Sequence, residues 1–262
     1  MPALEGRTAL ITGSTQGLGL VAAERFASAG CHVVITGLAG AIDPPAICRS
    51  LEQRYGVRSV YVPADLRRAD DAARLVDAAV AALGAVDVLV NNAVVRHAAP
   101  IDRFPPEAWD EAVAVNLSAA FHTIRGALPI MRARGWGRIV NVSSIYGVRG
   151  AANRAAYVAT KTGLVGLTRA VALETAGEDI TCNAVCPGTT RTPVHEEALA
   201  RLAGDRGLTP QDAERALLAG KQPTGRLIAP ERVADLMVYL CGPEAADITG
   251  AVLPIDGAWS AA

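Results

Sequence analysis

Tyr157 and Lys161 form the most chemically suggestive pair in the sequence. In a helix their spacing of four residues places both side chains on one face, one turn apart. A free phenol has a pKa of about 10 and is a poor base near neutrality unless a cation stabilises the phenolate, which Lys161 could do. Ser144 follows a predicted strand, and Asn116 lies further upstream. Taken alone, the Tyr-Lys pair is more often a buried tyrosine beside a surface lysine.

A glycine-rich turn stands between a predicted strand (residues 7–12) and a predicted helix (17–29). Glycines let the backbone approach a diphosphate closely, and the free N–H groups at the helix start favour an anion. The turn therefore predicts a dinucleotide site, although a glycine turn without a ligand is the alternative at this spacing. The turn residues that we expect at the cofactor are Gly13, Thr15, Gly17, Leu18 and Gly19.

The end of the second predicted strand bears on the choice between NAD and NADP. An acidic residue there binds the adenosine ribose 2′-hydroxyl, whereas an arginine favours a 2′-phosphate. The run from Ile35 to Gly40 contains neither. Because no cation is present there to neutralise a 2′-phosphate, we expect the cofactor to be NAD.

The elements that must position these side chains alternate along the chain. Apolar runs predict further strands at 31–36, 59–62, 87–91, 137–142, 180–185 and 251–255, with helices at 47–55, 70–83, 107–134, 157–176 and 230–240. Unbroken apolar strands indicate burial on both faces, and helices between them indicate parallel crossovers. We predict an α/β fold in which residues 1–262 form one Rossmann-type domain, with a doubly wound parallel sheet and helices on both faces.

The charged helical segment 189–222 breaks this alternation. Because it follows the carboxyl end of a strand, where ligands collect, we predict that it is an inserted lid. The alternative is an ordinary pair of surface helices.

Composition excludes several classes of protein. Hydrophobic residues make up 51% and charged residues 19% of the 262, which indicates a folded globular chain. The formal net charge of −1 and the lack of a Lys/Arg block predict no nucleic-acid partner. Without a signal-peptide pattern or a membrane-length apolar run, we expect a cytoplasmic protein. The five cysteines and four histidines lack metal-site spacing, so we predict no metal and structural roles for them.

Together these motifs resemble the short-chain dehydrogenase/reductase superfamily. The shared positions are Thr12-Gly13-x3-Gly17-x-Gly19, Asn91-Asn92-Ala93, Ser144, Tyr157-x3-Lys161 and Pro187-Gly188. The carboxyl half, including residues 116–119, 172–177, 221–223 and 256–259, is similar to bacterial D-3-hydroxybutyrate dehydrogenases. A homotetramer is expected from the same resemblance.

The resemblance implies oxidation of an alcohol to a ketone while a nicotinamide accepts hydride. Tyr157 would accept the hydroxyl proton, and Ser144 would hold the substrate oxygen. Lys161 would lower the tyrosine pKa and bind the nicotinamide ribose, and Asn116 would hold a relay water. Further cofactor contacts are implied at Asp65, Leu66, Asn91, Ala93, Pro187, Gly188, Thr190 and Thr192.

Several positions depart from the resembled branch. Val94 replaces a glycine, so it either strains the loop, if a positive φ is required, or narrows the pocket. Thr189 and Ala198 are smaller than the residues of the resembled branch, which predicts a small-molecule substrate larger than 3-hydroxybutyrate. Arg96 and Arg154 predict that this substrate carries a carboxylate or sulfonate. The alternative is that both arginines are solvated. Besides Ser144, the predicted substrate residues are Arg96, Tyr146, Arg154, Thr189, Ala198 and Trp259.

The sequence thus predicts an NAD-dependent dehydrogenase of a hydroxy acid or related polar alcohol. One rival is an NADPH-dependent ketoreductase for acyl or cyclic ketones. The other is a dinucleotide-sensing protein without turnover, against which the intact set Asn116, Ser144, Tyr157 and Lys161 argues.

Overall fold

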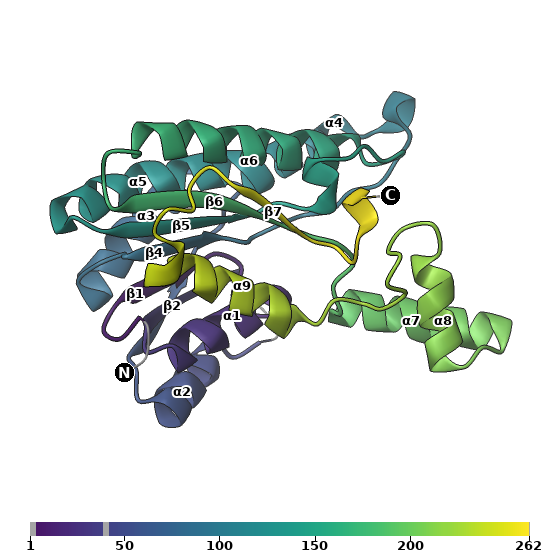
Figure 1. Ribbon diagram of the computed structural model, residues 1–262, viewed down its shortest axis with the longest axis horizontal. Helices are drawn as coiled ribbons and strands as arrows, with labels where there is room; N and C mark the ends of the chain where they lie inside the picture. Colours follow the sequence, from purple (N-terminus) through teal and green to yellow (C-terminus); the bar gives the residue numbers. More distant parts are fainter. Residues whose placement is uncertain (1–3, 39–41, 262) are drawn as a thin grey trace.

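The computed structural model describes residues 4–38 and 42–261. Within these ranges seven strands form one parallel sheet in the order β3-β2-β1-β4-β5-β6-β7 (Figure 1). The predicted α/β fold with a doubly wound parallel sheet is confirmed. The strands are β1 (Thr8–Ile11), β2 (His32–Gly37), β3 (Ser59–Pro63), β4 (Val88–Asn91), β5 (Gly137–Val142), β6 (Ile180–Pro187) and β7 (Val252–Ile255).

Helices cover both faces of the sheet (Figure 1). Buried side chains of α1, α2 and α9 pack on one face, and those of α3, α5 and α6 pack on the other. The helices are α1 (Gly17–Ser28), α2 (Pro44–Tyr55), α3 (Ala69–Leu83), α4 (Pro106–Val113), α5 (Ala119–Arg134), α6 (Ala155–Glu174), α7 (Pro193–Arg206), α8 (Pro210–Leu218) and α9 (Pro230–Cys241).

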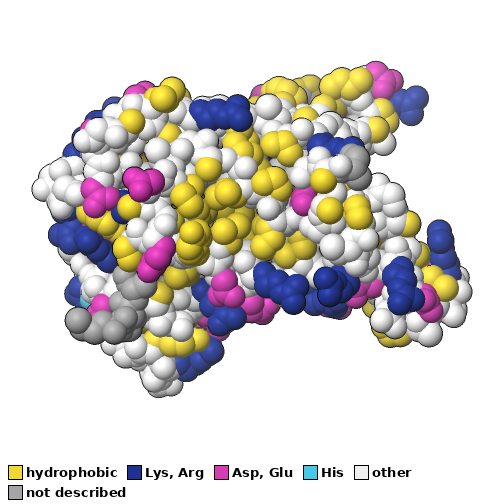
Figure 2. All heavy atoms as spheres, in the orientation of Figure 1, with side chains coloured by type: hydrophobic (Ala, Val, Ile, Leu, Met, Phe, Trp, Pro, Cys, Tyr) yellow, Lys and Arg dark blue, Asp and Glu magenta, His cyan; other side chains and the backbone are white. Residues whose placement is uncertain are grey.

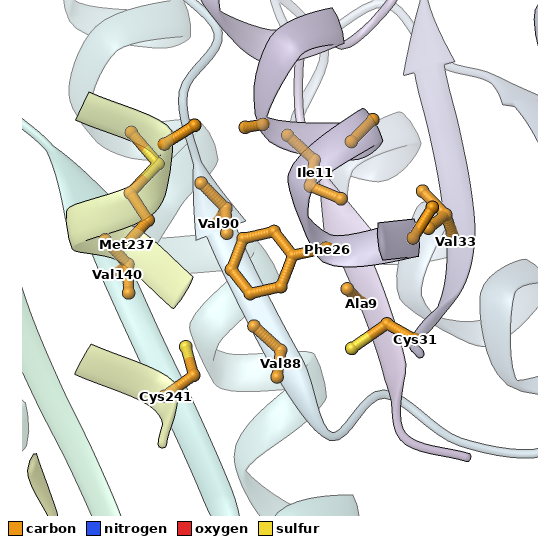
Figure 3. Close-up of a cluster of buried hydrophobic side chains, with 14 of the residues drawn as sticks. Ala9, Ile11, Phe26, Cys31, Val33, Val88, Val90, Val140, Met237 and Cys241 are labelled. Carbon is orange, nitrogen blue, oxygen red and sulfur yellow. The ribbon is translucent and has the colours of Figure 1, made fainter. Parts of the chain in front are cut away.

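The central strands are buried on both faces, which explains their unbroken apolar sequences. In β1, Ala9 and Ile11 belong to the cluster under α1, whereas Leu10 belongs to the opposite cluster. Figure 3 shows Phe26 of α1 inserted among small and branched side chains of the sheet, including Val90 of β4. Successive strand side chains point to opposite faces, so such a strand is mostly apolar, and a polar member such as Asn141 of β5 is buried with its amide hydrogen-bonded.

The helix predicted over 107–134 is interrupted. A π-helical turn, Ala114–Ser118, separates α4 from α5, and the N–H of Ala119 donates to the carbonyl of Ala114, five residues back. Such turns are frequent at functional sites, and Asn116 lies in the middle of this one.

The predicted lid segment is helical. It contains α7 and α8, which project from the sheet and its covering helices (Figure 1) and form a separate lobe on the surface (Figure 2). The two helices pack on each other through a small cluster of their own, made of Leu199, Ala213, Leu218 and Leu227. Since this cluster is separate from the two that flank the sheet, the lobe is joined to the body by few apolar contacts.

Candidate functional site

A cleft of about 750 Å³ opens where the chain leaves the carboxyl ends of the central strands. In the sheet order, β1 and β4 are neighbours whose following connections run to opposite sides, which is the switch point at which α/β sheets bind ligands. The turn after β1 lines the cleft, as do Ala93 after β4, Ser144 after β5 and Gly188 after β6. Topology therefore brings together segments that are far apart in the sequence.

Close packing of glycines shapes the cradle at one end of the cleft. Gly13 has a φ of +64°, and a Cβ there would lie 2.9 Å from the Cα of Ala93. A Cβ on Gly19 would overlap the carbonyl oxygen of Gly13. Asn92 ties the two loops together, because its N–H donates to Thr12 Oγ1 at 2.9 Å and its amide donates to the Thr12 carbonyl at 2.9 Å. A side chain at either glycine would fill this cradle. Without one, a diphosphate can approach the backbone closely.

Most of the predicted cofactor residues line this one cleft. They are Gly13, Thr15, Gly17, Leu18, Gly19, Asp65, Leu66, Ala93, Tyr157, Pro187, Gly188, Thr190 and Thr192. Asn91 and Lys161 do not line it. The Asn91 amide donates to Asn141 Oδ1 at 2.9 Å and accepts from Thr123 Oγ1 at 2.7 Å, and Lys161 lines a smaller cavity, so its contact with the nicotinamide ribose stays a prediction. Ala39 and Gly40, which entered the prediction of NAD, lie outside the described residues.

Tyr157 and Lys161 are brought together as their helical spacing predicts. Tyr157 is buried and lines the cleft, and the Lys161 Nζ lies 5.8 Å from the centre of its ring. Lys161 is fully buried and donates to the carbonyl of Val142 at 2.7 Å, which fixes the ammonium behind the phenol. Ser144, two residues further along from Val142, also contacts the Tyr157 hydroxyl.

Opposing effects act on the Tyr157 phenol. Burial alone raises its pKa, but the charges of Lys161 and Arg96 and hydrogen bonding by Ser144 and Arg96 outweigh burial, so the pKa lies below its ordinary value. For Lys161, burial lowers the pKa and the neighbouring phenolate opposes that shift. The site therefore favours a tyrosine that can give up and take back a proton.

Asn116 holds the loop after β4. Its Oδ1 accepts from the N–H of Val95 at 2.8 Å, and its Nδ2 donates to the Val95 carbonyl at 3.0 Å. A second cavity of about 10 Å³ is lined by Asn116 and Lys161, which is about the smallest space that holds one water molecule. Val94 is not among the non-glycine residues with positive φ, so it narrows the cleft without straining the loop.

The predicted substrate residues divide into two groups. Arg96 lines the cleft, and its guanidinium carbon lies 5.7 Å from the Tyr157 ring centre. Tyr146 packs edge-on against Tyr157 and against Trp259, with ring centres 6.2 Å and 5.5 Å apart. Arg154 lies near enough to Tyr146 to lower its pKa, although burial has the larger, raising effect. Of these four residues only Arg96 is among the described residues that line the cleft, so contact of Tyr146, Arg154 and Trp259 with substrate stays a prediction.

Thr189 and Ala198 stand apart from this group. Thr189 lies at the base of the lid segment, where its N–H donates to Gln222 Oε1 at 2.7 Å and its carbonyl accepts from the N–H of Ile228 at 3.0 Å. Ala198 is half-buried in α7. Neither is among the described residues that line the cleft, so their contact with substrate stays a prediction.

Sequence reasoning missed three titratable residues in the cleft lining, Arg67, Glu111 and His195. Arg67 donates two hydrogen bonds to the Asp65 carboxylate, from Nε to Oδ1 at 2.8 Å and from Nη2 to Oδ2 at 2.6 Å. This contact lowers the Asp65 pKa. His195 lies in the first turn of α7, and burial lowers its pKa, as does the charge of Arg96. His195 could have been predicted from the sequence, because it is a polar residue in the first helical turn after the carboxyl end of β6.

Among the residues that the structure describes, no group of three or more histidine, cysteine, aspartate or glutamate side chains could hold a metal ion. No helix in the described ranges is both long and apolar enough to cross a membrane.

Comparisons with known proteins match the chain over nearly its whole length. A family model described as short chain dehydrogenase matches residues 7–202. D-beta-hydroxybutyrate dehydrogenase of Cupriavidus necator is 41% identical, covering 98% of this chain and 99% of that protein. Cis-4-hydroxycyclohexanecarboxylate dehydrogenase of Sinomonas cyclohexanicum is 38% identical, covering 97% of each. L-Sorbose reductase from Gluconobacter frateurii, solved in complex with NADPH and L-sorbose, superposes with a TM-score of 0.92 at 30% identity, covering 98% of each.

Proposed function

The chain belongs to the short-chain dehydrogenase family, and from that premise we propose that it is an NAD-dependent dehydrogenase that interconverts a hydroxy acid and the corresponding keto acid. One observation carries the proposal: a single cleft holds both the glycine cradle and the Ser144–Tyr157 pair, with Lys161 behind the phenol. A binding protein without turnover needs the cradle but not a phenol flanked by cations.

Residues of the chain itself can remove the proton from the substrate hydroxyl group. Ser144 holds the substrate oxygen beside Tyr157, and the phenolate accepts the hydroxyl proton as the carbonyl forms. The nicotinamide, when bound in the cleft, supplies the acceptor for the hydride that leaves the same carbon. Lys161 stabilises the phenolate, and the cavity that it shares with Asn116 has room for the relay water.

The lining of the cleft supports an acidic substrate. Arg96 forms no ion pair with a carboxylate of the described residues. Lys161 and His195 are cationic or can become so beside it. The Glu111 carboxylate in the same lining is held by His97 at 2.8 Å. A guanidinium so placed can bind a carboxylate through two parallel hydrogen bonds. Relatives named for hydroxybutyrate and for a hydroxylated ring carboxylate support a substrate of this class, including one larger than 3-hydroxybutyrate.

Arg67 is an argument for NADP, the alternative cofactor, because it places a cation in the cleft lining that could bind a 2′-phosphate. Its guanidinium is already paired with the carboxylate of Asp65, however, which leaves it less available to a 2′-phosphate. We therefore retain NAD. Fluorescence titration with NADH and NADPH tests the choice, and tighter binding of NADPH would contradict it.

The activity itself is tested by following NADH formation with hydroxy acids and with neutral secondary alcohols of the same size. Because the base form of Tyr157 accepts the proton, kcat/KM for oxidation rises with pH and levels off above the Tyr157 pKa, below the usual phenol value of about 10. Tyr157→Phe should lose about 10²- to 10⁴-fold in rate while still binding NADH. Turnover by Tyr157→Phe at the wild-type rate would exclude the mechanism.

A homotetramer and a cytoplasmic location stay predictions from the resemblance and the sequence. The mass in solution, measured by light scattering, tests the first, and fractionation of the source cells tests the second.

A further inference from the structure

Arg96 reaches Tyr157 from an element other than the helix that carries the tyrosine. Lys161 approaches Tyr157 from within α6, with Nζ 5.8 Å from the ring centre, whereas Arg96 extends from the loop after β4 with its guanidinium carbon 5.7 Å from the same point. Arg96 is exposed to solvent through the open cleft, and Lys161 is buried. The phenol therefore has two cations near it, one that is buried and one that lines the cleft.

The two cations are chemically unequal. Burial lowers the pKa of Lys161, so the ammonium is held in its charged form partly by the phenolate itself. A guanidinium does not lose its proton in proteins, so Arg96 contributes a full charge at any working pH. This makes Arg96 the more dependable of the two charges.

We propose that Arg96 is a second cation for the Tyr157 phenolate and that the same guanidinium binds the acidic group of the substrate, so that substrate binding and the basicity of the catalytic tyrosine are linked. The second half rests on the proposed function, and the first half does not. Lys161 and Ser144 also face the phenol, from α6 and from the end of β5. The surrounding titratable or charged groups on neighbouring elements are Tyr146, Arg154, Cys186 and His195.

The linkage has a direction. In the free enzyme the charge of Arg96 acts on the phenol, but an acidic substrate that pairs with the guanidinium offsets part of that charge. The Tyr157 pKa should then be higher in the complex with an anionic substrate than in the free enzyme, and a neutral alcohol should leave it unchanged. Because kcat/KM reports the free enzyme and kcat reports the complex, the two pH profiles should separate only for the anionic substrate.

Arg96→Gln is the informative variant, Arg96→Lys restores the charge, and Arg103→Gln is the matched control. Arg103 lies on the same connection between β4 and α4, is exposed and pairs only with Asp102 among the described residues. Near-ultraviolet absorbance of the tyrosinate, taken as the difference from each variant's own Tyr157→Phe derivative, reports the Tyr157 pKa without any turnover. We expect Arg96→Gln to raise this pKa by about 0.5–1 unit, Arg96→Lys to reverse most of the rise, and Arg103→Gln to cause none.

Turnover separates the two roles of Arg96. With 2-butanol, Arg96→Gln should lower kcat/KM about three- to tenfold near neutrality, and the deficit should shrink as the pH passes the raised pKa. With D-3-hydroxybutyrate a further loss of about tenfold or more, present at all pH values, should come from the missing anion contact. An unchanged tyrosinate titration in Arg96→Gln would overturn the inference even if the enzyme oxidises hydroxy acids. A shifted titration together with a failure to oxidise any hydroxy acid would uphold the electrostatic role and overturn the proposed function and the substrate half.

Discussion

Replacing Asn116 by alanine tests whether this residue acts chiefly as a clamp on the loop after β4. The change removes two hydrogen bonds with Val95, from its N–H at 2.8 Å and to its carbonyl at 3.0 Å, together with a long and weak one to Thr160 Oγ1 at 3.4 Å. At about 1 kcal/mol for each net hydrogen bond, the expected loss in free energy of unfolding is about 2 kcal/mol. That is a modest part of a typical 5–15 kcal/mol, so the variant should still fold.

The assay is thermal unfolding together with NADH titration. For a chain of this size about 2 kcal/mol corresponds to a fall in Tm of about 4–8 °C. NADH should also bind more weakly, because Val94 and Arg96, on either side of Val95, line the cleft. Asn116→Asp is the companion variant, since it keeps an acceptor for the Val95 N–H but loses the donor to the carbonyl, and its Tm should also fall.

A relay role alone predicts a different outcome. If Asn116 served only to hold a water beside Lys161, the alanine variant would lose kcat while its Tm and NADH affinity stayed at wild-type values. A fall in Tm of less than 1 °C would therefore refute the clamp.

Two further predictions concern packing. Gly19→Ala should abolish NADH binding and lower the free energy of unfolding by about 1–3 kcal/mol, because its Cβ would overlap the Gly13 carbonyl oxygen. Gly166→Ala, with no atom within 4 Å of its Cβ, should instead stabilise α6 by about 0.5–1 kcal/mol. Unfolding of both variants by urea measures these changes. Equal behaviour of the two variants would contradict the close approach. Burial raises the pKa of Cys31 and of Cys182 to about 12, so native protein should react slowly with a water-soluble thiol reagent near neutrality, and all five cysteines should react after denaturation. Rapid reaction of the native protein would show that the thiols are accessible.

The sequence predicted the sheet and the edge at which the site lies. Two local rules were sufficient for this: unbroken apolar runs mark strands covered on both faces, and intervening helices make the connections parallel. The family resemblance was also confirmed, because the family model matches residues 7–202, which include Tyr157, Lys161 and the glycine turn.

What the sequence did not predict depends on contacts between distant segments. Arg67 enters the cleft from the loop after β3, and His195 enters from the start of α7, yet neither stands in a motif. The helix expected over 107–134 was wrong in its middle, because helical periodicity continues through the π-turn at 114–118. Helix propensity does not distinguish a π-turn, which has one extra residue, from an α-helical turn. In this π-turn the side chain of Asn116 binds Val95.

The hydrogen bonds between Asn116 and Val95 also explain why the loop tolerates a valine at position 94. Asn116 holds both main-chain groups of Val95, so the path of the loop is fixed by a residue on the π-turn rather than by the conformational freedom of residue 94. With the backbone of Val94 outside the positive-φ region, a β-branched side chain costs only space in the cleft. Val94→Gly should therefore enlarge the cleft while leaving the position of Arg96 under the control of Asn116.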